Sequence, residues 1–462
     1  MKKVKLLLTM AVIVFSTMIC CSMSAFALTD GDWEFKLLDN EVTITGYNGT
    51  EENVVIPSHI FNTPVTAVSG SNLFPTAVTL TFPDSVSTVC SYICNRVGTN
   101  NVLETVILPE GVRVIEANAF HNCESLKNIV LPNTLTNIKG GYYEGAFQGC
   151  KSLESINFPE NLVEIGRYAF EGSGLKEIDM SLAIKLENIG SCAFSRCENL
   201  KKVKLGNGLK ALSGEMFAYC SALTDVELPS SLTSLGANCF WYCSSLEYII
   251  LPTSLKSIGD FALCECTSLK EVVVPYGTES ISKGAFQSCP SLLSVYVPDT
   301  VTKTPDGSLM NGSNNAIVYC SADSKMAEYC KKKSVSYLTD NSVNSGIHVL
   351  YNGTRISFHA YGQNPELLES RTLVPLRSIF EAMGAGVEWD GATSTAIAKR
   401  DGIEVKIQIG ANEMYKNGNT IPVDVPAMLL NDRTMVPVRV IAEAFGADVQ
   451  WNGNGRTVII TE

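Results

Sequence analysis

Seven cysteines at one position of a repeated segment are the residues whose type and spacing first suggest chemistry. They are Cys123, Cys150, Cys197, Cys220, Cys243, Cys266 and Cys289, and Ser173 holds the same position once. Such a series could bind a metal, supply a nucleophile, form disulfides or fill a core as small apolar residues. Equivalent residues in stacked turns lie about 5 Å apart with parallel side chains, which disfavours disulfides between them. We therefore expect a column of buried free thiols.

Other cysteines leave a disulfide open, because exported proteins often carry them. Cys320 and Cys330 could clamp the end of the repeats, and Cys90 with Cys94 is a weaker candidate. A zinc site is disfavoured, since no C-x-x-C pair occurs in the sequence.

The remaining candidates for catalysis lack the required patterns. His59, His121, His348 and His359 do not have metal-binding spacing, and there is no G-x-S-x-G, H-E-x-x-H or P-loop motif. No catalytic, cofactor-binding or metal-ligating residue is therefore predicted. We expect a protein that is not an enzyme and uses no cofactor, with a secreted enzyme as the least favoured alternative.

The N-terminus has the pattern of a secretory signal peptide. Three lysines among the first five residues precede an apolar run to Cys20, and a small-x-small cleavage pattern follows at Ala25–Ala27. Residues 1–27 are expected to be removed, and a retained signal anchor is the alternative. The rest of the chain keeps 32 basic and 47 acidic side chains, which argues against nucleic acid or an anionic membrane as partner. No later apolar run is long enough to predict a membrane span in the mature chain.

The thiols belong to a repeat that can be followed by its phenylalanines. The markers are Phe120, Phe147, Phe170, Phe194, Phe217, Phe240, Leu263 and Phe286, at intervals of 27, 23, 24, 23, 23, 23 and 23 residues. A period in this range is typical of a solenoid, in which neighbouring turns bury each other's apolar faces. We expect about eleven turns.

Each repeat contains one segment that alternates like a short strand. In "SLKEVVVP", Leu269, Val272 and Val274 can face inward while Glu271 and Val273 face outward. Proline closes most of these segments, where no further ladder hydrogen bond is needed. The half that follows is too short for a regular helix, so it is expected to form tight or 3₁₀ turns on the outer face.

These repeats resemble the BspA-type leucine-rich repeat, whose pattern LxxIxLPxxLxxIGxxAFxxCxxL they follow from about Val54 to Val297. The resemblance implies a curved parallel-β solenoid of a bacterial cell-surface or secreted protein that serves adhesion or protein binding. It does not identify a ligand.

Both ends of the repeat array, residues 54–315, are expected to carry caps. Residues 28–53 alternate across Asp39 and Asn40 and should form an N-terminal hairpin. Residues 316–338 have the pattern of a strand, a short helix and a strand. A polar linker, 339–345, then leads to a second domain.

The second domain, 346–462, is internally duplicated. "RTLVPLRSIFEAMGAGVEWDG" from Arg371 returns as "RTMVPVRVIAEAFGADVQWNG" from Arg433. Pro375 suits a helix start, and apolar residues at helical spacing follow it up to Gly384. Alternating segments around each helix predict hairpins, and the whole predicts a small α+β domain.

This duplicated motif resembles the copper amine oxidase N-terminal-like domain, which implies a stalk that lies far from the copper site of those oxidases. Their cofactor site includes an Asn-Tyr dipeptide, and this sequence contains none. The resemblance therefore implies a fold and no activity. Four arginines recur in the motif and are expected to pair with acids or carbonyls, with polymer binding as the alternative: Arg371, Arg377, Arg433 and Arg439.

The outward positions of the strands predict two features of the concave face. Three neighbouring turns carry Glu177/Asp179, Lys202/Lys204 and Asp225/Glu227, which should pair across strands. The following turns offer an exposed apolar surface that we call the tyrosine patch. It consists of Tyr248, Ile250, Val273, Leu293 and Tyr296. It is the predicted partner-binding site, and its alternatives are simple β-propensity or cover by the C-terminal cap.

Together these features predict a secreted or extracellular binding protein, with cell-wall association left open. Its partner would be a protein or a surface polymer of a host matrix or of its own envelope, and the second domain would act as spacer or attachment. The alternative is a structural envelope component that associates with itself.

Overall fold

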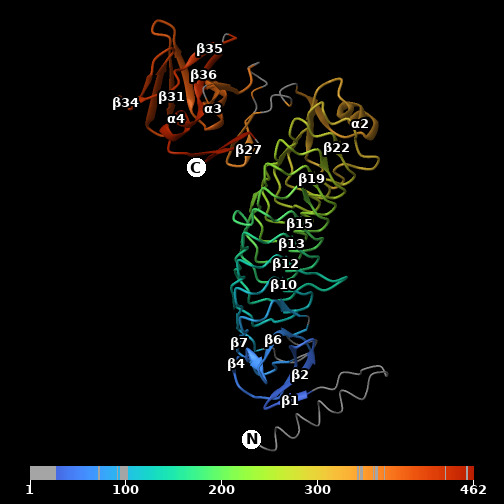
Figure 1. Cartoon of the computed structure of the whole chain (residues 1–462). Coiled ribbons are helices and arrows are strands. Elements are labelled where there is room, and N and C mark those ends of the chain that lie inside the picture. Colours follow the sequence, from blue (N-terminus) through green and yellow to red (C-terminus); the bar gives the residue numbers. More distant parts are fainter. Residues whose placement is uncertain are drawn as a thin grey trace, which may run out of the picture.

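The chain folds into an elongated solenoid with a smaller domain beside its C-terminal end (Figure 1). The computed structural model describes residues 28–70, 73–90, 92–93, 102–340, 343, 347–356, 358, 363–368, 370–431, 433–453 and 456–462. The predicted signal peptide, most of the predicted linker, Cys94 and His359 lie outside these residues. Within them, no helix has the length and apolar character that crossing a membrane requires.

A hairpin opens the described chain. β2 (Trp33–Leu38) and β3 (Glu41–Tyr47) pair antiparallel around Asp39 and Asn40, whose φ angles are 47° and 63°. A two-residue turn with two positive φ values matches the twist of the flanking strands. β1 (Leu28–Asp30) extends the hairpin, and β3 pairs in parallel with β6 (Thr63–Val68), which also pairs with β5 (His59–Ile60). The hairpin thus covers the first turn of the solenoid.

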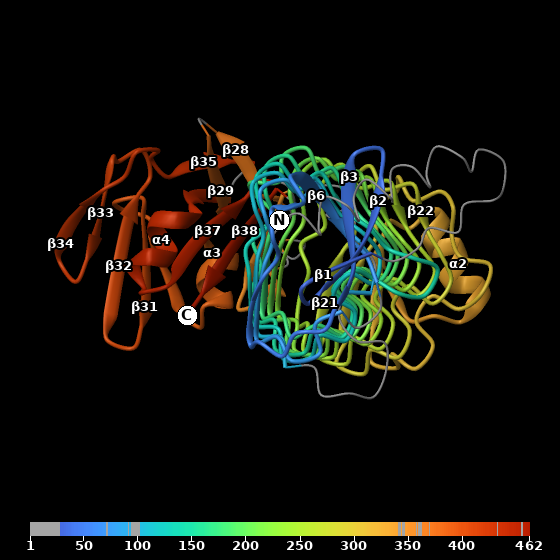
Figure 2. The same ribbon diagram turned by 60° about the horizontal axis from the view of Figure 1, so that its bottom comes forward.

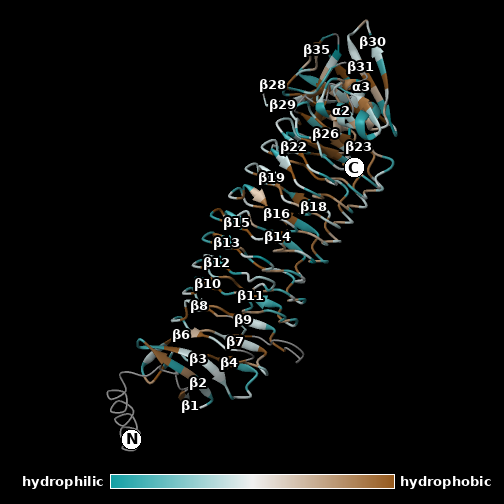
Figure 3. Cartoon of the chain, turned by 90° about the vertical axis from the view of Figure 1, so that its right-hand side faces the viewer, coloured by the Kyte–Doolittle hydropathy of each residue, from teal (hydrophilic) through white to brown (hydrophobic). Residues whose placement is uncertain are grey.

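The alternating segments form the first parallel sheet, in three sections. Its strands are β4 (Asn53–Val55), β7 (Thr79–Thr81), β9 (Thr105–Ile107) and β11 (Asn128–Ile129); β14 (Glu177–Asp179), β16 (Lys202–Lys204) and β18 (Asp225–Glu227); and β21 (Glu271–Val273), β23 (Ser294–Tyr296), β24 (Ile317–Cys320) and β25 (Tyr337–Thr339). Figure 3 shows these turns stacked as rungs along the solenoid. Their alternation places one side chain inward between two outward ones, as predicted.

The second half of each repeat differs from the expectation of turns alone, because it contributes a two-residue strand to a second parallel sheet. Its strands are β8 (Thr88–Val89), β10 (Val114–Ile115), β12 (Asn137–Ile138), β13 (Glu164–Ile165) and β15 (Asn188–Ile189), followed by β17 (Ala211–Leu212), β19 (Ser234–Leu235), β20 (Ser257–Ile258) and β22 (Ser280–Ile281). A glycine follows four of these strands, β13, β15, β19 and β20, and permits close stacking there, since a Cβ on Gly166 would lie 2.1 Å from the backbone nitrogen of Gly140. Tight turns follow, as expected, without a 3₁₀ helix in the described part of the solenoid.

The marker phenylalanines form a continuous stack in the core. Neighbouring ring centroids from Phe120 to Phe240 are 5.1–5.7 Å apart, and all these side chains are buried. Most turns bend at residues with positive φ, two positions before and two after the marker phenylalanine, although at Phe147 only the later position, Gly149, has a positive φ. Around Phe240 these are Asn238 (57°) and Tyr242 (59°).

The C-terminal cap follows the predicted strand, helix and strand: β24, α2 (Lys325–Lys333) and β25. Ser324 caps the helix, because its hydroxyl accepts the backbone N–H of Ala327 at 3.1 Å. Tyr329 on this helix donates to the carbonyl of Gly307 and accepts the N–H of Leu309. The helix therefore closes the last turn of the repeats.

The described residues of the second domain form two helices and three sheets. The helices are α3 (Leu376–Ala382) and α4 (Val438–Ala444). The sheets are β27 (Thr354–Arg355), β26 (His348–Tyr351), β38 (Thr457–Thr461) and β37 (Asp448–Asn452); β28 (Glu366–Leu368), β29 (Arg371–Pro375), β36 (Arg433–Pro437) and β35 (Met428–Leu430); and β30 (Gly386–Asp390), β31 (Thr395–Arg400), β32 (Ile403–Gln408), β33 (Glu413–Lys416) and β34 (Asn419–Pro422).

The duplication appears as a pair of equivalent strand–helix units. β29 and β36 pair antiparallel with Val374 opposite Val436, and each strand leads directly into its helix. Phe380 and Phe445 meet edge to face between the units, with ring centroids 5.6 Å apart.

Candidate functional site: the first sheet and its interdomain contact

The repeated cysteines are structural, and each thiol has a defined acceptor. The Sγ of Cys150 donates to the carbonyl of Phe120, one turn earlier, at 3.1 Å, and Cys220 donates to that of Phe194 at 3.2 Å. The same bond recurs from Cys197, Cys243, Cys266 and Cys289. Burial raises the pKa of the Cys220 thiol well above its usual value, so the nucleophilic thiolate is suppressed.

The column of thiols departs from the expectation at one residue, Cys123, and has one further member, Ser313. Cys123 takes part in a disulfide and is not a free thiol. Ser313 occupies the same position in the last turn, where its hydroxyl donates to the carbonyl of Phe286 at 2.7 Å. The sequence contained a signal for this residue, because Gly312-Ser313 repeats the Gly172-Ser173 pair.

The alternative disulfides are not formed among the described cysteines. Cys320 and Cys330 are both buried free thiols, and Cys90 is a half-buried one. His59 contacts Ser58, His121 is half-buried, and His348 is buried. The described residues contain no group of three or more His, Cys, Asp or Glu side chains arranged to hold a metal ion.

The charged block on the first sheet pairs across strands as expected. Lys202 lies 3.6 Å from Asp225, and Lys204 lies 3.7 Å from Glu227. These side chains are exposed, and such pairs contribute at most about 1 kcal/mol each. In the second domain, Arg371 pairs with Asp424 at 2.5 Å, while Arg377 and Arg439 pair with acids one helical turn away.

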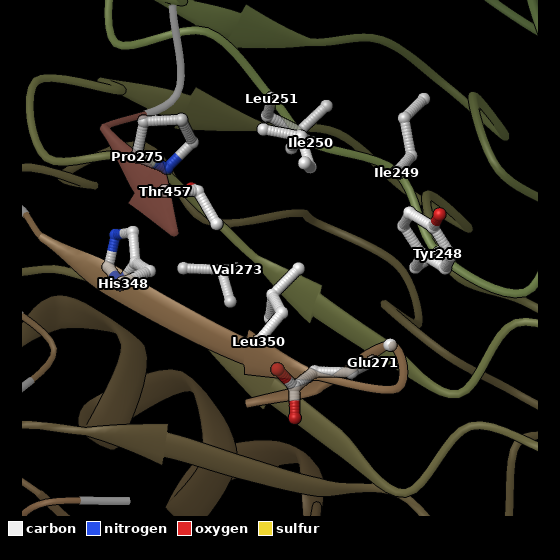
Figure 4. A pocket seen from close by; sticks show the side chains of 11 residues that line it. Tyr248, Ile249, Ile250, Leu251, Glu271, Val273, Pro275, His348, Leu350 and Thr457 are labelled. Carbon is white, nitrogen blue, oxygen red and sulfur yellow. The ribbon is translucent and has the colours of Figure 1, made fainter. Parts of the chain in front are cut away.

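The tyrosine patch is not the exposed surface expected from the sequence. Tyr296 is only 6% exposed, and Tyr248, Ile250 and Val273 are half-buried. Only Leu293, at the edge of the patch, is open to solvent at 58%. The physical reason is that the β26–β27 hairpin of the second domain lies over these strands, as the close-up in Figure 4 shows.

Arg355 makes the most specific contact with the patch. Its guanidinium carbon lies 4.2 Å from the ring centroid of Tyr296, a cation–π distance. Tyr296 also stacks on Tyr319 of the next turn, with ring centroids 4.7 Å apart. On the neighbouring turn, a Cβ built on Gly353 would lie 3.2 Å from Cδ1 of Tyr248, so the hairpin backbone passes directly against that ring.

An acid is buried beneath the same hairpin. Glu271 is 5% exposed, and Ser294 donates to its Oε2 at 2.9 Å. Burial raises the pKa of the Glu271 carboxyl to about 7, although hydrogen bonds from the Arg355 backbone and Ser294 and the charge of Arg355 act in the opposite direction. His348 lines the same cavity, and burial, with the charges of Arg355 and Arg456, holds its pKa well below the usual value.

This cavity does not provide room for catalysis. The space available to the centre of a water-sized sphere is about 20 Å³, which suits one or two water molecules. Glu271 and His348 resemble an acid–base pair by residue type, but an organic substrate does not fit between them. The geometry is that of a packed interface.

The first turns of the first sheet carry exposed apolar residues that were not predicted as a surface feature from the sequence. Val55, Ile107 and Val130 are 66%, 51% and 72% exposed. Thr81 pairs with Val55 on one side and Ile107 on the other, and the pairing of Ile129 with Val106 places Val130 beside Ile107. We call these four residues the apolar stripe. Outward β-branched residues on adjacent turns were the available signal.

The repeat pattern matches a known family over more than half of the chain. The BspA type leucine-rich repeat region matches with six copies, at residues 51–145, 91–184, 142–247, 187–316 and 234–349. The chain belongs to the BspA-type leucine-rich repeat family. The copper amine oxidase N-terminal domain matches at residues 351–460. A search of curated proteins found no match.

This BspA-type protein is similar to solved structures of bacterial leucine-rich repeat proteins, of which the first below supports the fold. A leucine-rich repeat protein from Bacteroides ovatus ATCC 8483 shares 23% identity at a TM-score of 0.51, over 71% of this chain and 82% of that one. A leucine-rich cell surface protein from Faecalibacterium prausnitzii A2-165 shares 24% identity at a TM-score of 0.38, over 68% and 99%. The family and fold are those of repeat proteins that act in protein interaction, and the copper amine oxidase N-terminal domain is a non-catalytic domain.

Proposed function

We propose that this protein is an exported binding protein that recognises another protein or a surface polymer through the open part of its first sheet. The observation that carries the proposal is the apolar stripe, because exposed Val55, Ile107 and Val130, with Thr81 between the first two, gather apolar surface along neighbouring turns, and such patches mark interaction surfaces. Export rests on the signal-peptide pattern of residues 1–27.

The second domain is proposed to attach the protein to the cell envelope as well as to extend it. Trp389 in β30 and Trp451 in β37 occupy equivalent positions of the duplication and are 49% and 41% exposed. Exposed tryptophans supply large, rigid contact areas and recur as anchors at interfaces. A Trp389→Ala/Trp451→Ala variant should lose retention on isolated cell walls, whereas Tyr415→Ala, an exposed aromatic of the same domain, should not.

The test of the recognition face uses the mature chain on an array of matrix proteins and cell-wall polysaccharides. Val55→Thr/Ile107→Thr/Val130→Thr keeps β-propensity but removes apolar contact, and should weaken binding to any captured ligand at least about tenfold. Val163→Thr/Leu182→Thr/Ile184→Thr changes three exposed apolar residues away from the stripe and serves as the matched control. Equal loss in both variants would contradict recognition by the stripe. Self-association of the mature chain without capture of any ligand would favour a structural envelope component instead.

A further inference from the structure

The tyrosine patch and the β26–β27 hairpin meet through both apolar and polar contacts. The hairpin brings an arginine to the face of Tyr296 and a glycine turn to the ring of Tyr248. The patch brings a buried carboxyl, Glu271, to the backbone of Arg355. A flat apolar surface alone would not require these polar matches, so the contact has the features of a specific binding site.

Leu350 shows that the hairpin is adapted to this surface. It is only 6% exposed and lines the cavity between the domains, yet it is not part of the hydrophobic core of its own domain, to which its neighbour Val349 belongs. On a strand, successive side chains face opposite sides. Val349 therefore packs into the second domain, while Leu350 faces the solenoid, toward Val273 and Glu271 (Figure 4).

The connection between the two parts favours binding within one chain. Only residues 341–346 separate the C-terminal cap from the first residues of the second domain. A tether this short holds a binding partner at an effective concentration of about millimolar, so at micromolar protein the hairpin binds the patch of its own chain in preference to that of a second copy. Figure 1 places the second domain beside the C-terminal turns of the solenoid, and Figure 2, viewed from the N-terminal end, shows that it lies to one side of the stacked turns.

We propose that the tyrosine patch is an acceptor site for an arginine-bearing β-hairpin, and that the β26–β27 hairpin of the same chain fills it as a displaceable plug. In the docked state, the recognition face consists of the earlier turns, including the apolar stripe. Displacement of the hairpin adds the tyrosine patch to that face. Because this inference concerns a contact within the chain, it does not depend on which ligand the apolar stripe binds.

The test places a site for a sequence-specific protease in residues 341–346 of the otherwise intact mature chain. After cleavage, the two parts should still elute as one 1:1 complex at micromolar concentration, and should separate on dilution. Arg355→Glu and Leu350→Asp should each separate the parts immediately after cleavage. Arg377→Glu, which changes an exposed arginine on α3 of the same domain, should leave the complex intact.

A second measurement, on the uncleaved chain, distinguishes loss of the hairpin contact from unfolding of the variant. Acetylation of Tyr248 and Tyr296, followed by mass spectrometry, should accelerate at least about tenfold in Arg355→Glu, because the side chains lose their cover. Acetylation of Tyr415, which lies elsewhere in the second domain, should stay unchanged. Separation of the unmutated parts at micromolar concentration after cleavage would overturn the proposal. Unchanged tyrosine reactivity in Arg355→Glu and Leu350→Asp would also overturn it. A stable dimer of the uncleaved chain that Arg355→Glu dissolves would assign the hairpin to the patch of a second copy and overturn docking within one chain.

Discussion

At six turns of the solenoid, a thiol hydrogen adds a hydrogen bond to a backbone carbonyl one turn earlier, and the Phe194 carbonyl also accepts the backbone N–H of Cys197. A typical hydrogen bond of this kind contributes about 0.5–1.5 kcal/mol. Cysteine supplies a donor in a side chain small and apolar enough for the core, and Ser173 and Ser313 show that a hydroxyl fits the same place. The sequence indicated the buried column, but the acceptor depends on bends at positive φ that residue types alone did not reveal.

Two substitutions of one cysteine distinguish the contribution of the thiol hydrogen bond to stability from the contribution of the side-chain volume. Cys220→Ala removes the donor to Phe194 and leaves a small void, and should lower stability by about 1–2 kcal/mol. Cys220→Ser keeps a donor, and should cost less than about 1 kcal/mol. Thermal melting of the mature chain measures both. If serine destabilises the chain as much as alanine does, the hydrogen bond contributes nothing and the thiol acts only as an apolar filler.

Glu271 gives the interface a dependence on pH whose sign follows from burial. Its pKa is raised from 4.5 to about 7 in the folded chain, so the folded state holds the proton more tightly. The contribution to stability is fully present below about pH 4.5 and is lost as the pH rises through 7, by at most about 3 kcal/mol. Glu271→Gln should therefore melt like the unmutated protein at pH 5 and at a higher temperature at pH 8.

His348 contributes a pH dependence of stability opposite in sign to that of Glu271, and comparing Glu271→Gln with the unmutated protein cancels it. Its lowered pKa means that the folded state keeps the ring neutral, so its contribution is lost as the pH falls below about 6.5. The exposed Glu247→Gln serves as control and should show no gain that grows with pH. A constant difference between Glu271→Gln and the unmutated protein from pH 5 to 8 would be inconsistent with a buried, protonated carboxyl.

At the scale of elements, the first sheet could be predicted and the second could not. "SLKEVVVP" shows alternation over enough residues to identify a strand, whereas β20 consists only of Ser257 and Ile258. Two residues cannot display a period of two. Their pairing arises only when turns stack, with a glycine that lets the backbones approach.

At one interruption of the first sheet, a side chain makes hydrogen bonds to the backbone of the preceding turn. Residues 155–157 form no strand, but the amide of Asn157 donates to the carbonyl of Leu131 and accepts its N–H, both at 2.8 Å. Asn157→Ala would leave both Leu131 groups without these partners, and should cost about 1–3 kcal/mol. Hydrogen exchange at the Leu131 amide should accelerate, whereas Asn128→Ala, on an adjacent strand, should not change it. Unaltered exchange at Leu131 in Asn157→Ala would show that the ladder does not depend on this amide.

At the scale of the whole molecule, the sequence predicted both folds but not how they contact each other. The hydrophobic periodicity of a domain predicts which side chains enter the core of that domain. All other side chains are then predicted to be exposed, including those that contact another domain. Tyr296 was therefore assigned to a solvent-facing position, although Arg355 of the second domain covers its ring. The available signal was chemical: outward aromatic and aliphatic residues at the C-terminal turns, close in sequence to a hairpin with an outward leucine and an arginine.

Removal of the second domain tests whether its cover keeps the protein apart from other copies of itself. A chain ending at Asp340 retains the C-terminal cap, whose last strand is held by the bond from the Asp340 N–H to the Cys320 carbonyl. The solenoid should therefore remain folded, while the tyrosine patch becomes exposed. Apolar patches of this kind promote association, so sedimentation velocity at the same micromolar concentration should show a higher oligomeric state for residues 28–340 than for the mature chain, which we expect to be monomeric. Tyr248→Ser/Tyr296→Ser in the shortened chain should restore the monomer, and a shortened chain that stays monomeric without these changes would rule out a protective role for the cover.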